Sequence, residues 1–325
     1  ALYHPTEGYY SSGAPLEAHQ DFYTSPGSHP AFGALIALQL EQMWHLLGMP
    51  SPFWIVEQGA GSGLLSQGVM SFLQSYSPDF YQAATYVLVD RTAPSTAKNK
   101  TDTYCWVRSS TLPFSNLRGC ILCNELLDSF PVHRVVAKGG RLQEIYVGLE
   151  GDRLVEVTDE PSTPMLSQRL EESRRAGLAE GQQAEINLGI EPWLKEASNA
   201  LSAGFLLNVD YGDLAPALYA PHRRLGTLLG YYRHTESYDP FAHLGYQDLT
   251  AHVDFTAVIN AGRKHHFKEA GFTTQRDFLL NLGIRGFIAA LGKLDISQPV
   301  SDANRFAMME LINPEGLGKF KVLAL

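Results

Sequence analysis

Hydrophobic residues recur with helical spacing near the start of the chain. In residues 31 to 48 the large apolar side chains fall on or near one stripe of a helix: Leu35, Leu38, Met43, Leu46 and Leu47. Gly48 and Pro50 follow, and residues of these types end helices. The pattern predicts an amphipathic helix over residues 31 to 48.

Short apolar runs alternate with helix-like stretches along most of the chain. Residues 53 to 57 form such a run, a glycine-rich turn spans 59 to 63, and residues 64 to 75 are helix-like. Six further segments are expected to be strands, at residues 86–89, 104–107, 119–123, 205–209, 272–278 and 318–325. This alternation predicts an α/β fold with a mainly parallel sheet and helices on both faces.

Two segments do not fit a minimal sheet of this kind. Residues 132 to 158 alternate apolar and polar positions around Gly139-Gly140 and Glu150-Gly151, which predicts β-hairpins. With helices expected at 163–178 and 191–203, they predict an inserted cap over residues 132 to 203. Residues 211 to 255 predict a loop-rich insertion in a core made of residues 1–131 and 204–325. Both insertions are expected at the carboxyl-end rim of the sheet, where such folds bind ligands.

Composition limits the function classes. The chain has 325 residues, a formal net charge of -9 and a pI near 5.6, which disfavours a nucleic-acid-binding surface. Neither an apolar run of membrane-spanning length nor a signal peptide is evident. The chain starts at Ala1 rather than Met, so we expect a missing N-terminal part.

Cysteine and histidine do not predict a metal site. Cys120 and Cys123 form a CxxC pair inside the apolar run 119–123, so we expect both to be buried in a strand, with a reducing compartment as the best match. No second CxxC completes a zinc site. Six histidines in the second half of the chain match no compact ligand spacing, and the last two are expected on a solvent-facing helix: His222, His234, His243, His252, His265 and His266.

The glycine-rich turn carries the first chemical signal. Gly59, Gly61 and Gly63 follow Glu57 at alternate positions, which lets backbone approach a ligand closely. A dinucleotide fingerprint needs a third glycine three residues after the second, where this chain has Leu64 or Ser66. The pattern instead resembles motif I of class I methyltransferases, whose cofactor is S-adenosylmethionine.

Acidic residues follow two predicted strands beside this turn. Asp90 ends the strand at 86–89, where a carboxylate can accept hydrogen bonds from both ribose hydroxyls of adenosine. Glu57 ends the strand before the turn. Each has a simpler alternative as a helix-capping or turn residue.

The chain resembles the MidA family of methyltransferases nearly from end to end. The matching runs are Leu2-Tyr-His-Pro5, Gly8-Tyr-Tyr10, Asp21-Phe-Tyr-Thr-Ser-Pro26, Asn124-Glu-Leu-Leu-Asp-Ser-Phe-Pro131, Val209-Asp-Tyr-Gly212, Gly226-Thr-Leu-Leu-Gly-Tyr-Tyr-Arg-His234 and Gln247-Asp-Leu-Thr-Ala-His-Val-Asp-Phe255. The resemblance implies a class I, Rossmann-like methyltransferase with a seven-stranded sheet. The family includes a mitochondrial arginine methyltransferase that assists assembly of respiratory complex I.

Several positions depart from the family pattern. Gly27 stands where the family usually has Glu, and His29 where it has Ser. Ala60 and Leu64 replace Pro and Thr in the glycine turn. These four positions surround the glycine turn that is expected to bind the cofactor. We still expect S-adenosylmethionine to bind, but the methyl acceptor can differ from that of the family.

Candidate site residues follow from the resemblance and from strand ends. Cofactor contacts are expected from Thr24, Ser25, Pro26, Glu57, Gly59, Gly61, Gly63, Asp90 and Asn124. Acidic or basic groups expected at the acceptor are Glu125, Asp128, Asp210 and His252, with Glu125 nearest to it. Substrate contacts are expected from Tyr211, Tyr231, Tyr232 and Asp254. The tyrosines, with Tyr238, Phe241 and Tyr246, either line an aromatic pocket or pack a cap, and Asp128 and His252 also suit capping and structural roles.

The leading hypothesis is a methyltransferase that modifies an arginine side chain of a protein, for example a respiratory complex subunit. A small-molecule methyltransferase and a non-catalytic assembly factor remain as alternatives. Nucleic-acid partners and membrane insertion are not expected, and the chain is expected to be a monomer or homodimer. The expected location is the cytoplasm for a bacterial source and the mitochondrion for a eukaryotic one.

Overall fold

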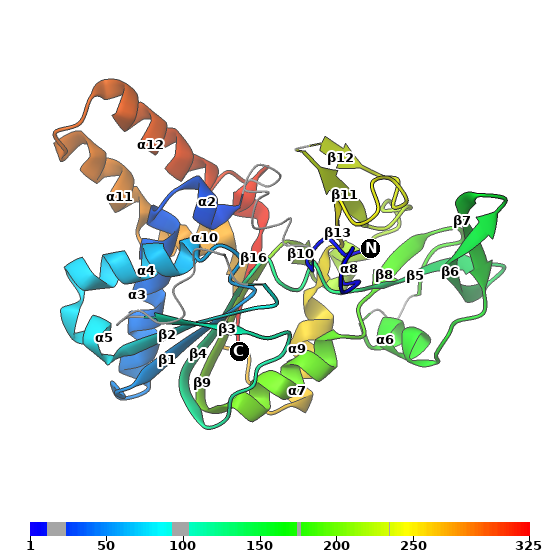
Figure 1. The fold of residues 1–325 in the computed structure, drawn as a ribbon, viewed down its shortest axis with the longest axis horizontal. Helices are drawn as coiled ribbons and strands as arrows, with labels where there is room; N and C mark the ends of the chain where they lie inside the picture. Colours follow the sequence, from blue (N-terminus) through cyan, green and yellow to red (C-terminus); the bar gives the residue numbers. More distant parts are fainter. Residues whose placement is uncertain (12–23, 93–103, 174–176, 234) are drawn as a thin grey trace. The chain divides into compact units, whose positions relative to one another are not determined.

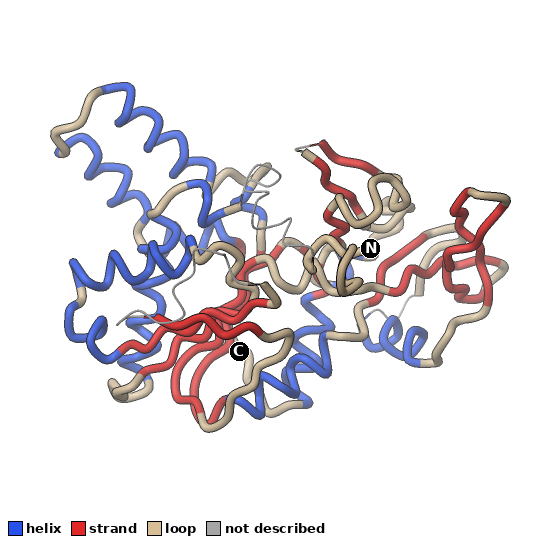
Figure 2. Tube along the Cα trace, in the orientation of Figure 1, coloured by secondary structure: helices blue, strands red, loops and turns tan. Residues whose placement is uncertain are grey.

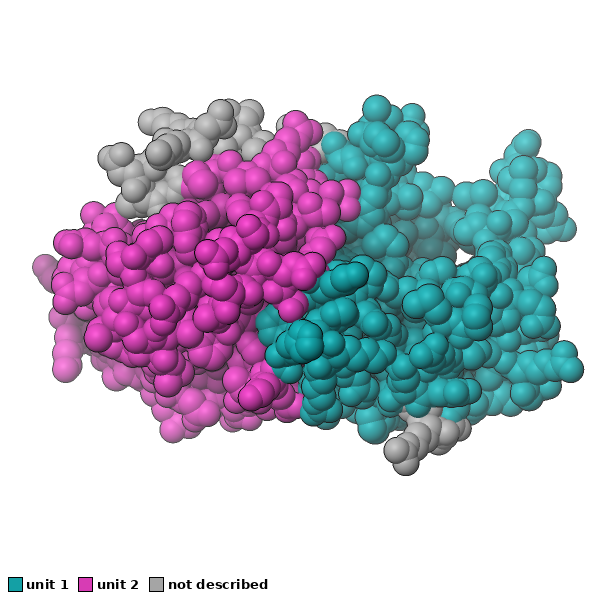
Figure 3. Space-filling model, turned by 90° about the horizontal axis from the view of Figure 1, so that it is seen from below, with its two compact units in different colours: residues 1–14, 127–195, 211–267 teal, residues 15–126, 196–210, 268–325 magenta. Residues whose placement is uncertain are grey.

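A computed structural model describes residues 1–11, 24–92, 104–173, 177–233 and 235–325. These residues form two compact units, coloured separately in Figure 3. Unit 1 comprises residues 1–14, 127–195 and 211–267, and unit 2 comprises residues 15–126, 196–210 and 268–325. Residues 211–267, placed in the core domain by the sequence analysis, thus group with the hairpin segment.

A seven-stranded sheet forms the centre of unit 2, with the strand order β15-β16-β9-β4-β1-β2-β3 (Figure 1). Its strands are β1 (Phe53–Gln58), β2 (Ala84–Asp90), β3 (Tyr104–Arg108), β4 (Leu117–Asn124), β9 (Leu201–Asp210), β15 (Gly271–Thr274) and β16 (Lys321–Ala324). β1, β2, β3, β4 and β9 pair in parallel, and β16 runs antiparallel to both β9 and β15. The predicted α/β fold with a mainly parallel sheet is confirmed.

Helices flank this sheet in unit 2, as Figure 2 shows in blue. They are α2 (Ser25–Ser28), α3 (Ala31–Leu46), α4 (Leu64–Tyr76), α5 (Pro78–Ala83), α10 (Gln275–Asn281), α11 (Ile284–Ala290) and α12 (Gln298–Glu310), with two short 3-10 turns at Leu291–Lys293 and Leu317–Lys319. The helix predicted over residues 31 to 48 is α3, but residues 31–37 are buried on all sides of it. Only its second half has two faces: Leu40 and Met43 are buried there, whereas Leu46 of the predicted stripe is exposed.

Unit 1 is built from small antiparallel sheets. The first has the order β7-β6-β5-β8 and contains β5 (His133–Lys138), β6 (Arg141–Glu150), β7 (Arg153–Asp159) and β8 (Gln183–Ile186). The predicted hairpins over residues 132 to 158 are thereby confirmed, since Gly139-Gly140 and Glu150-Gly151 lie at their turns.

The loop-rich part of unit 1 contains short elements. A second sheet has the order β12-β11-β13, and β10 pairs in parallel with β14. These strands are β10 (Gly212–Asp213), β11 (Leu229–Tyr232), β12 (Thr235–Ser237), β13 (Asp248–Thr250) and β14 (Val253–Asp254). The helices are α6 (Met165–Ser173), α7 (Ile190–Ala200, whose last five residues belong to unit 2), α8 (Ala215–Leu218) and α9 (Phe255–Lys264).

Two secondary-structure predictions were wrong in part. The strand expected over residues 272–278 ends at Thr274, whose hydroxyl accepts from Asp277 N–H and caps α10. The side chains of Thr and Asp favour such a cap over a continued strand. His265 and His266 lie beyond the end of α9 at Lys264, and His266 has a φ of 69°.

Some sequence predictions fall outside the described residues. Asp21, Phe22 and Tyr23 of the Thr-Ser-Pro run are among them, as are His234 and residues 174–176 of the helix expected at 163–178.

An acidic residue lies inside the core of unit 2. Glu57 on β1 is 4% exposed and accepts a 2.7 Å hydrogen bond from the Tyr86 hydroxyl on the neighbouring β2. Burial raises the pKa of Glu57 to about 8, although the bond from Tyr86 lowers it in part. The protonated carboxyl is therefore the form that suits this position, since burying the charged form costs free energy.

Phe53 is expected to be important for the stability of unit 2. Its side chain is fully buried at the start of β1, and its ring meets Phe80 edge-on with 5.3 Å between centroids. We expect Phe53→Ala to lower the free energy of unfolding by about 3–5 kcal/mol, because the change removes buried area and leaves a cavity. Urea denaturation measures this, with exposed Leu46→Ala as the control that should change it by less than about 0.5 kcal/mol.

Glu57 is expected to make stability depend on pH. Its pKa is about 8 in the folded chain against an ordinary 4.5, so its stabilising contribution is complete below the lower pKa and is lost as pH rises to the higher one. We expect the free energy of unfolding of the native protein to fall relative to Glu57→Gln between about pH 5 and about pH 8. Parallel urea titrations of both proteins test this, and a constant difference would contradict it.

Candidate cofactor and acceptor sites

The glycine turn of unit 2 joins β1 to α4 in a conformation that only glycine adopts readily. Gly59, Gly61 and Gly63 have φ values of 74°, 52° and 78°. Gly59 N–H donates to the Val89 carbonyl at 2.9 Å, which ties the turn to the end of β2. A Cβ on Gly61 would meet no atom of the described residues within 4 Å, so none of them covers the backbone of the turn at this point.

Asp90 ends β2 beside this turn, as the sequence predicts. One carboxylate oxygen accepts from Gly61 N–H at 2.9 Å, and the other accepts from Thr92 N–H at 3.0 Å. Burial raises the pKa of Asp90, and these backbone hydrogen bonds oppose the shift. The Thr92 hydroxyl also donates to the second oxygen, at 3.4 Å. The oxygen bonded to Gly61 has a further lone pair, so Asp90 can hold the turn and still accept a bond from a ligand.

Asn124 ends β4 and has an unused acceptor. Its amide nitrogen donates to the Glu125 carboxylate at 2.9 Å, while its Oδ1 is buried and has no hydrogen-bond partner in the part of the chain that the structure describes. Glu125 adopts a φ of 52°, uncommon for a residue with a side chain, and its N–H donates to Val209 at 2.8 Å. The end of β4 therefore combines backbone strain with an orphaned acceptor.

Other candidate polar residues of unit 2 form hydrogen bonds within the protein. Asp210 is fully buried at the end of β9 and accepts from Leu126 N–H at 3.2 Å. Thr24 caps α2, and the buried Ser25 donates to Gln275 at 3.0 Å, whereas Pro26 occupies the first turn of α2. These contacts explain how the predicted residues are positioned. That the same residues bind a ligand stays a prediction.

The two cysteines of the CxxC pair are free and buried in β4. Burial raises the pKa of Cys120 to about 12 and that of Cys123 well above its usual range. Both thiols are therefore protonated small hydrophobic groups, which agrees with the expectation of a buried strand.

Unit 1 brings carboxylates and phenols together in what we call the acid–tyrosine cluster, formed by Tyr10, Asp128, Tyr211, Tyr231 and Asp248. The Tyr211 hydroxyl donates to Asp128 Oδ2, and the Tyr10 hydroxyl donates to Asp248 Oδ2 at 2.7 Å. Asp128 and Asp248 are 6% and 5% exposed. Asp128 Oδ1 is buried and has no hydrogen-bond partner among the residues described.

The electrostatics of this cluster link its members. Burial, followed by the charges of Asp248 and Asp128, raises the pKa of Tyr10 well above its usual range. Burial and nearby carboxylates, Asp128 and Asp248 included, raise the pKa of Tyr231 to about 12. Burial also raises the pKa of Asp128 to about 6. Both carboxylates thus act on both phenols, and the cluster is an acidic environment suited to a cation.

His252 and Asp254 lie next to this cluster along the chain. The His252 ring meets the Tyr211 ring edge-on at 5.4 Å, and His252 N–H donates to Thr227 Oγ1 at 3.1 Å. Asp254 caps α9 by accepting from Ala257 N–H and also accepts from the Tyr219 hydroxyl. The capping role considered for acidic residues therefore applies at Asp254.

The remaining aromatic candidates differ in their contacts and in their exposure to solvent. Tyr232 stacks on His243 at 4.1 Å, with the Arg233 guanidinium 5.2 Å from its ring centre. Tyr238 and Tyr246 are 79% and 72% exposed. These two tyrosines therefore do not pack a cap in the described chain.

Sequence reasoning did not assign Tyr10 and Asp248 to a site. Both lie inside runs that resemble the family, Gly8-Tyr-Tyr10 and Gln247-Asp-Leu-Thr, so the runs contained the signal. Their pairing was out of reach because 238 residues separate them along the chain.

The residues described contain no group of three or more His, Cys, Asp or Glu side chains arranged to hold a metal ion. Within the same part of the chain, no helix combines the length and apolar character needed to cross a bilayer.

Comparisons with known proteins identify the family and agree with the fold. A family model described as "Putative S-adenosyl-L-methionine-dependent methyltransferase" matches residues 35–273. A crystal structure of a Burkholderia thailandensis protein bound to S-adenosyl-homocysteine superposes with a TM-score of 0.85 at 28% identity, covering 99% of this chain and 84% of that one.

Curated relatives share lower identity. The mitochondrial protein arginine methyltransferase NDUFAF7 homolog of Drosophila melanogaster is 26% identical over 291 residues, which are 79% of this chain and 63% of that protein. The corresponding Rattus norvegicus protein is 25% identical, over 87% of this chain and 69% of its own length. The chain thus spans a little under two thirds of the fly protein. Because the family model covers well over half of the chain, this protein belongs to that family of S-adenosyl-L-methionine-dependent methyltransferases.

Proposed function

We propose that this protein transfers a methyl group from S-adenosylmethionine to the guanidinium of an arginine side chain in a protein. The observation that carries the proposal is the buried, unpartnered Oδ1 of Asp128 within the acid–tyrosine cluster. The curated relatives, named as protein arginine methyltransferases, support the choice of acceptor.

The residues of unit 2 fit the cofactor. No atom of the described residues lies within 4 Å of a Cβ at Gly61, so there is room for a ligand against this backbone. Asp90 Oδ2, which accepts from Gly61 N–H, has a further lone pair for a ribose hydroxyl. The buried Asn124 Oδ1 needs a donor, and the cofactor's amino group is one. When bound, S-adenosylmethionine supplies an activated methyl group on its sulfonium.

The residues of unit 1 fit an arginine. A planar guanidinium pairs with carboxylate oxygens through several N–H donors, and tyrosine faces attract cations. Asp128 Oδ1 is free to accept such a bond, and Asp248 carries the second carboxylate. In a buried cluster this pairing offsets the cost of the carboxylate charge.

The reaction also needs a proton acceptor. As the acceptor nitrogen forms its bond to carbon and the sulfur–carbon bond breaks, the guanidinium loses one proton and remains a cation. Burial holds the pKa of Asp128 at about 6, closer to neutrality than that of an ordinary Asp. An acid–base group with such a pKa suits this proton transfer near neutral pH.

The chain path supports a division of labour between the units. It passes from unit 2 to unit 1 after Leu126 and again after Asp210. Asp128 and Tyr211, which bond to each other, are therefore each only a few residues from a strand end of the sheet in unit 2. In this proposal unit 2 binds the cofactor and unit 1 the acceptor.

The decisive experiment supplies the protein with methyl-labelled S-adenosylmethionine and two pools, proteins and small molecules from one lysate. Label on arginine in the protein pool is the expected result. Label only in the small-molecule pool would replace the proposed acceptor, and cofactor binding without transfer to either pool would favour an assembly role.

Asp90→Ala should weaken cofactor binding, because it removes both the ribose acceptor and the bond that holds Gly61 N–H. We expect the dissociation constant for S-adenosylmethionine to rise by roughly tenfold or more, measured by calorimetry. Asp79→Ala, at an exposed position of α5, is the matched control and should bind as the native protein does. Equal affinity in the Asp90 variant would remove this residue from the site.

Asp128→Asn should slow methyl transfer while sparing cofactor affinity. The amide keeps the shape of the side chain and can still accept from Tyr211, but it neither pairs a guanidinium charge nor takes its proton. We expect kcat on an arginine peptide to fall by about 100-fold or more. Asp152→Asn, exposed in the turn between β6 and β7, is the control, and an unchanged kcat in the Asp128 variant would contradict the assignment.

A further inference from the structure

Tyr211 contacts the carboxylate that the proposed function uses. It follows directly after β9, which ends at Asp210. Its hydroxyl donates to Asp128 Oδ2, so the protein itself holds one oxygen of that carboxylate. Asp128 Oδ1 is buried and has no hydrogen-bond partner among the described residues. The two oxygens of Asp128 therefore have different surroundings, and Tyr211 is the side chain that makes them different.

One short segment holds both partners of this bond by its backbone. Ala251 N–H donates to the Asp128 carbonyl at 3.0 Å, and Val253 N–H donates to the Tyr211 carbonyl at 3.0 Å. Gly212, the next residue after Tyr211, pairs with Val253 so closely that a Cβ would lie 2.2 Å from the Val253 carbonyl oxygen. Asp128 and Tyr211 are 83 residues apart in the chain, so this shared support fixes them relative to each other.

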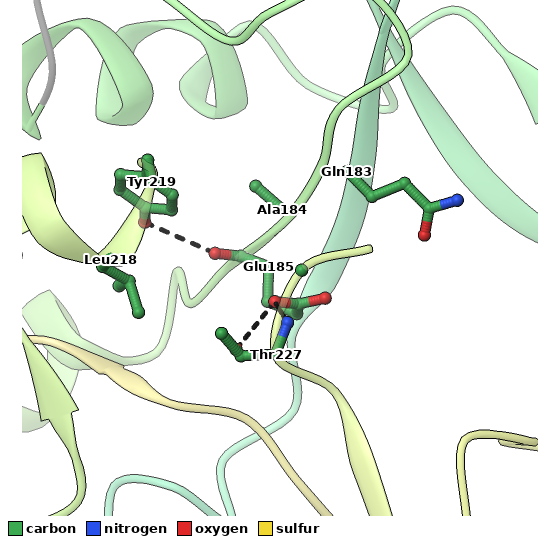
Figure 4. Close-up of a pocket in the computed structure, with 7 residues that line it drawn as sticks. Gln183, Ala184, Glu185, Leu218, Tyr219 and Thr227 are labelled. Atoms are coloured by element: carbon green, nitrogen blue, oxygen red, sulfur yellow. Dashed lines mark hydrogen bonds between the residues drawn. The ribbon is translucent and has the colours of Figure 1, made fainter. Parts of the chain in front are cut away.

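His252 lies between these two backbone donors. Its N–H donates to Thr227 Oγ1 at 3.1 Å, and its ring meets the Tyr211 ring edge-on with 5.4 Å between centroids. Thr227 in turn donates from its N–H and its Oγ1 to Glu185 Oε2, at 2.7 Å and 2.8 Å (Figure 4). The Glu185 side chain is 7% exposed. Because buried hydrogen bonds of this kind favour a single arrangement, the Tyr211 ring has a defined place.

The hydrogen bond from Tyr211 opposes the effect of burial on Asp128. Burial raises the pKa of Asp128 to about 6, and the bond from Tyr211 is the largest effect that lowers it. A hydrogen bond donated to a carboxylate favours its charged form. Without this donor the pKa of Asp128 would rise further, and the carboxyl would be protonated in large part at neutral pH. The Tyr211 hydroxyl thus helps to keep the buried carboxyl ionised.

Four other titratable groups lie around this bond, on different elements: Tyr10, Tyr231, Asp248 and His252. Burial and then carboxylate charges raise the pKa of Tyr10 well above its usual range, whereas burial and nearby carboxylates raise that of Tyr231 to about 12. The two phenols therefore stay protonated where Asp128 titrates. Tyr10 donates to Asp248 at 2.7 Å. Asp248 and His252 are the groups from which the titration of Asp128 has to be distinguished.

We propose that Tyr211 is a positioning residue for methyl transfer, because its hydroxyl holds Asp128 Oδ2 and keeps the carboxylate ionised, which leaves Oδ1 to meet the guanidinium. This role rests on the proposed function, in which the nitrogen–carbon bond forms, the sulfur–carbon bond of the cofactor breaks and the proton leaving nitrogen passes to Asp128. With one oxygen occupied, the carboxylate favours a bond from one guanidinium nitrogen over a fork in which both oxygens take part. Tyr211 thus acts through Asp128.

The test compares Tyr211→Phe with the native protein in the methylation of an arginine peptide, from about pH 5 to about pH 9. Because loss of the donor raises the pKa of Asp128, we expect the acidic limb of the kcat profile to move upward by about one pH unit or more. The kcat of the variant should be lower by roughly tenfold or more at about pH 5 and approach the native value at about pH 9. Tyr76→Phe, at a position that is 76% exposed, is the matched control and should keep the native profile.

A second measurement follows the carboxyl group itself and needs no methyl transfer. The NMR signal of the isotope-labelled Asp128 carboxyl carbon is identified by its loss in Asp128→Asn, which separates it from Asp248. Its titration midpoint should lie at higher pH in Tyr211→Phe than in the native protein. Fluorotyrosine at position 211 keeps the ring and is a stronger donor, so it should move the midpoint to lower pH. This protein tests the proposal even where Tyr211→Phe does not fold.

Two outcomes would overturn the role of Tyr211. One is a kcat that falls equally at every pH in Tyr211→Phe, which is what a purely structural role predicts. The other is an Asp128 midpoint that neither Tyr211→Phe nor fluorotyrosine moves. A protein that methylates arginine with an unmoved limb and midpoint would lose this role alone. A protein whose Asp128 midpoint moves as expected, but which transfers no methyl group to arginine, would lose the proposed function while the hold of Tyr211 on Asp128 stands.

Discussion

The glycine turn of unit 2 depends on the hydrogen bond between the Asp90 carboxylate and the Gly61 amide. Three residues with positive φ in one short turn would be mobile on their own, because glycine has the largest conformational freedom. The bond to Asp90, together with those from the turn to the Val89 carbonyl, holds the turn against the adjacent strand. The strand order of the sheet places β2 next to β1, so this constraint follows from the topology itself.

Most of the fold could be predicted from local sequence patterns. The helix over residues 31 to 48, the turn at 59–63 and the hairpins around Gly139-Gly140 were predictable because each is specified by residues that are close in sequence. Residues 275–278 were misassigned because Thr274 caps α10 by accepting from Asp277 N–H, which ends the strand at Thr274. His265 and His266 were placed on a helix, but α9 ends at Lys264, before both of them.

The same distinction between local and distant residues applies to the candidate site residues. Asp90 could be placed beside the glycine turn because both follow adjacent parallel strands. Tyr10 with Asp248, and Glu185 with Thr227, join segments far apart in the chain, so no spacing rule pairs them. Nor does a sequence reveal which oxygen of a carboxylate stays unused; Asp128 Oδ1 became apparent only through burial and hydrogen bonding. The polar group most relevant to the proposed reaction is one that the fold buries and leaves unsatisfied.

The path of the chain between the units has an evolutionary consequence. The segments of unit 1 leave the sheet after Leu126 and after Asp210, just beyond the ends of β4 and β9. Insertions or exchanges within 127–195 and 211–267 therefore leave the strands and the glycine turn of unit 2 unchanged. Under the proposed division of labour, a lineage could vary the acceptor by altering these two segments while inheriting the cofactor site intact. The departures at Gly27 and His29 lie in unit 2, outside both segments.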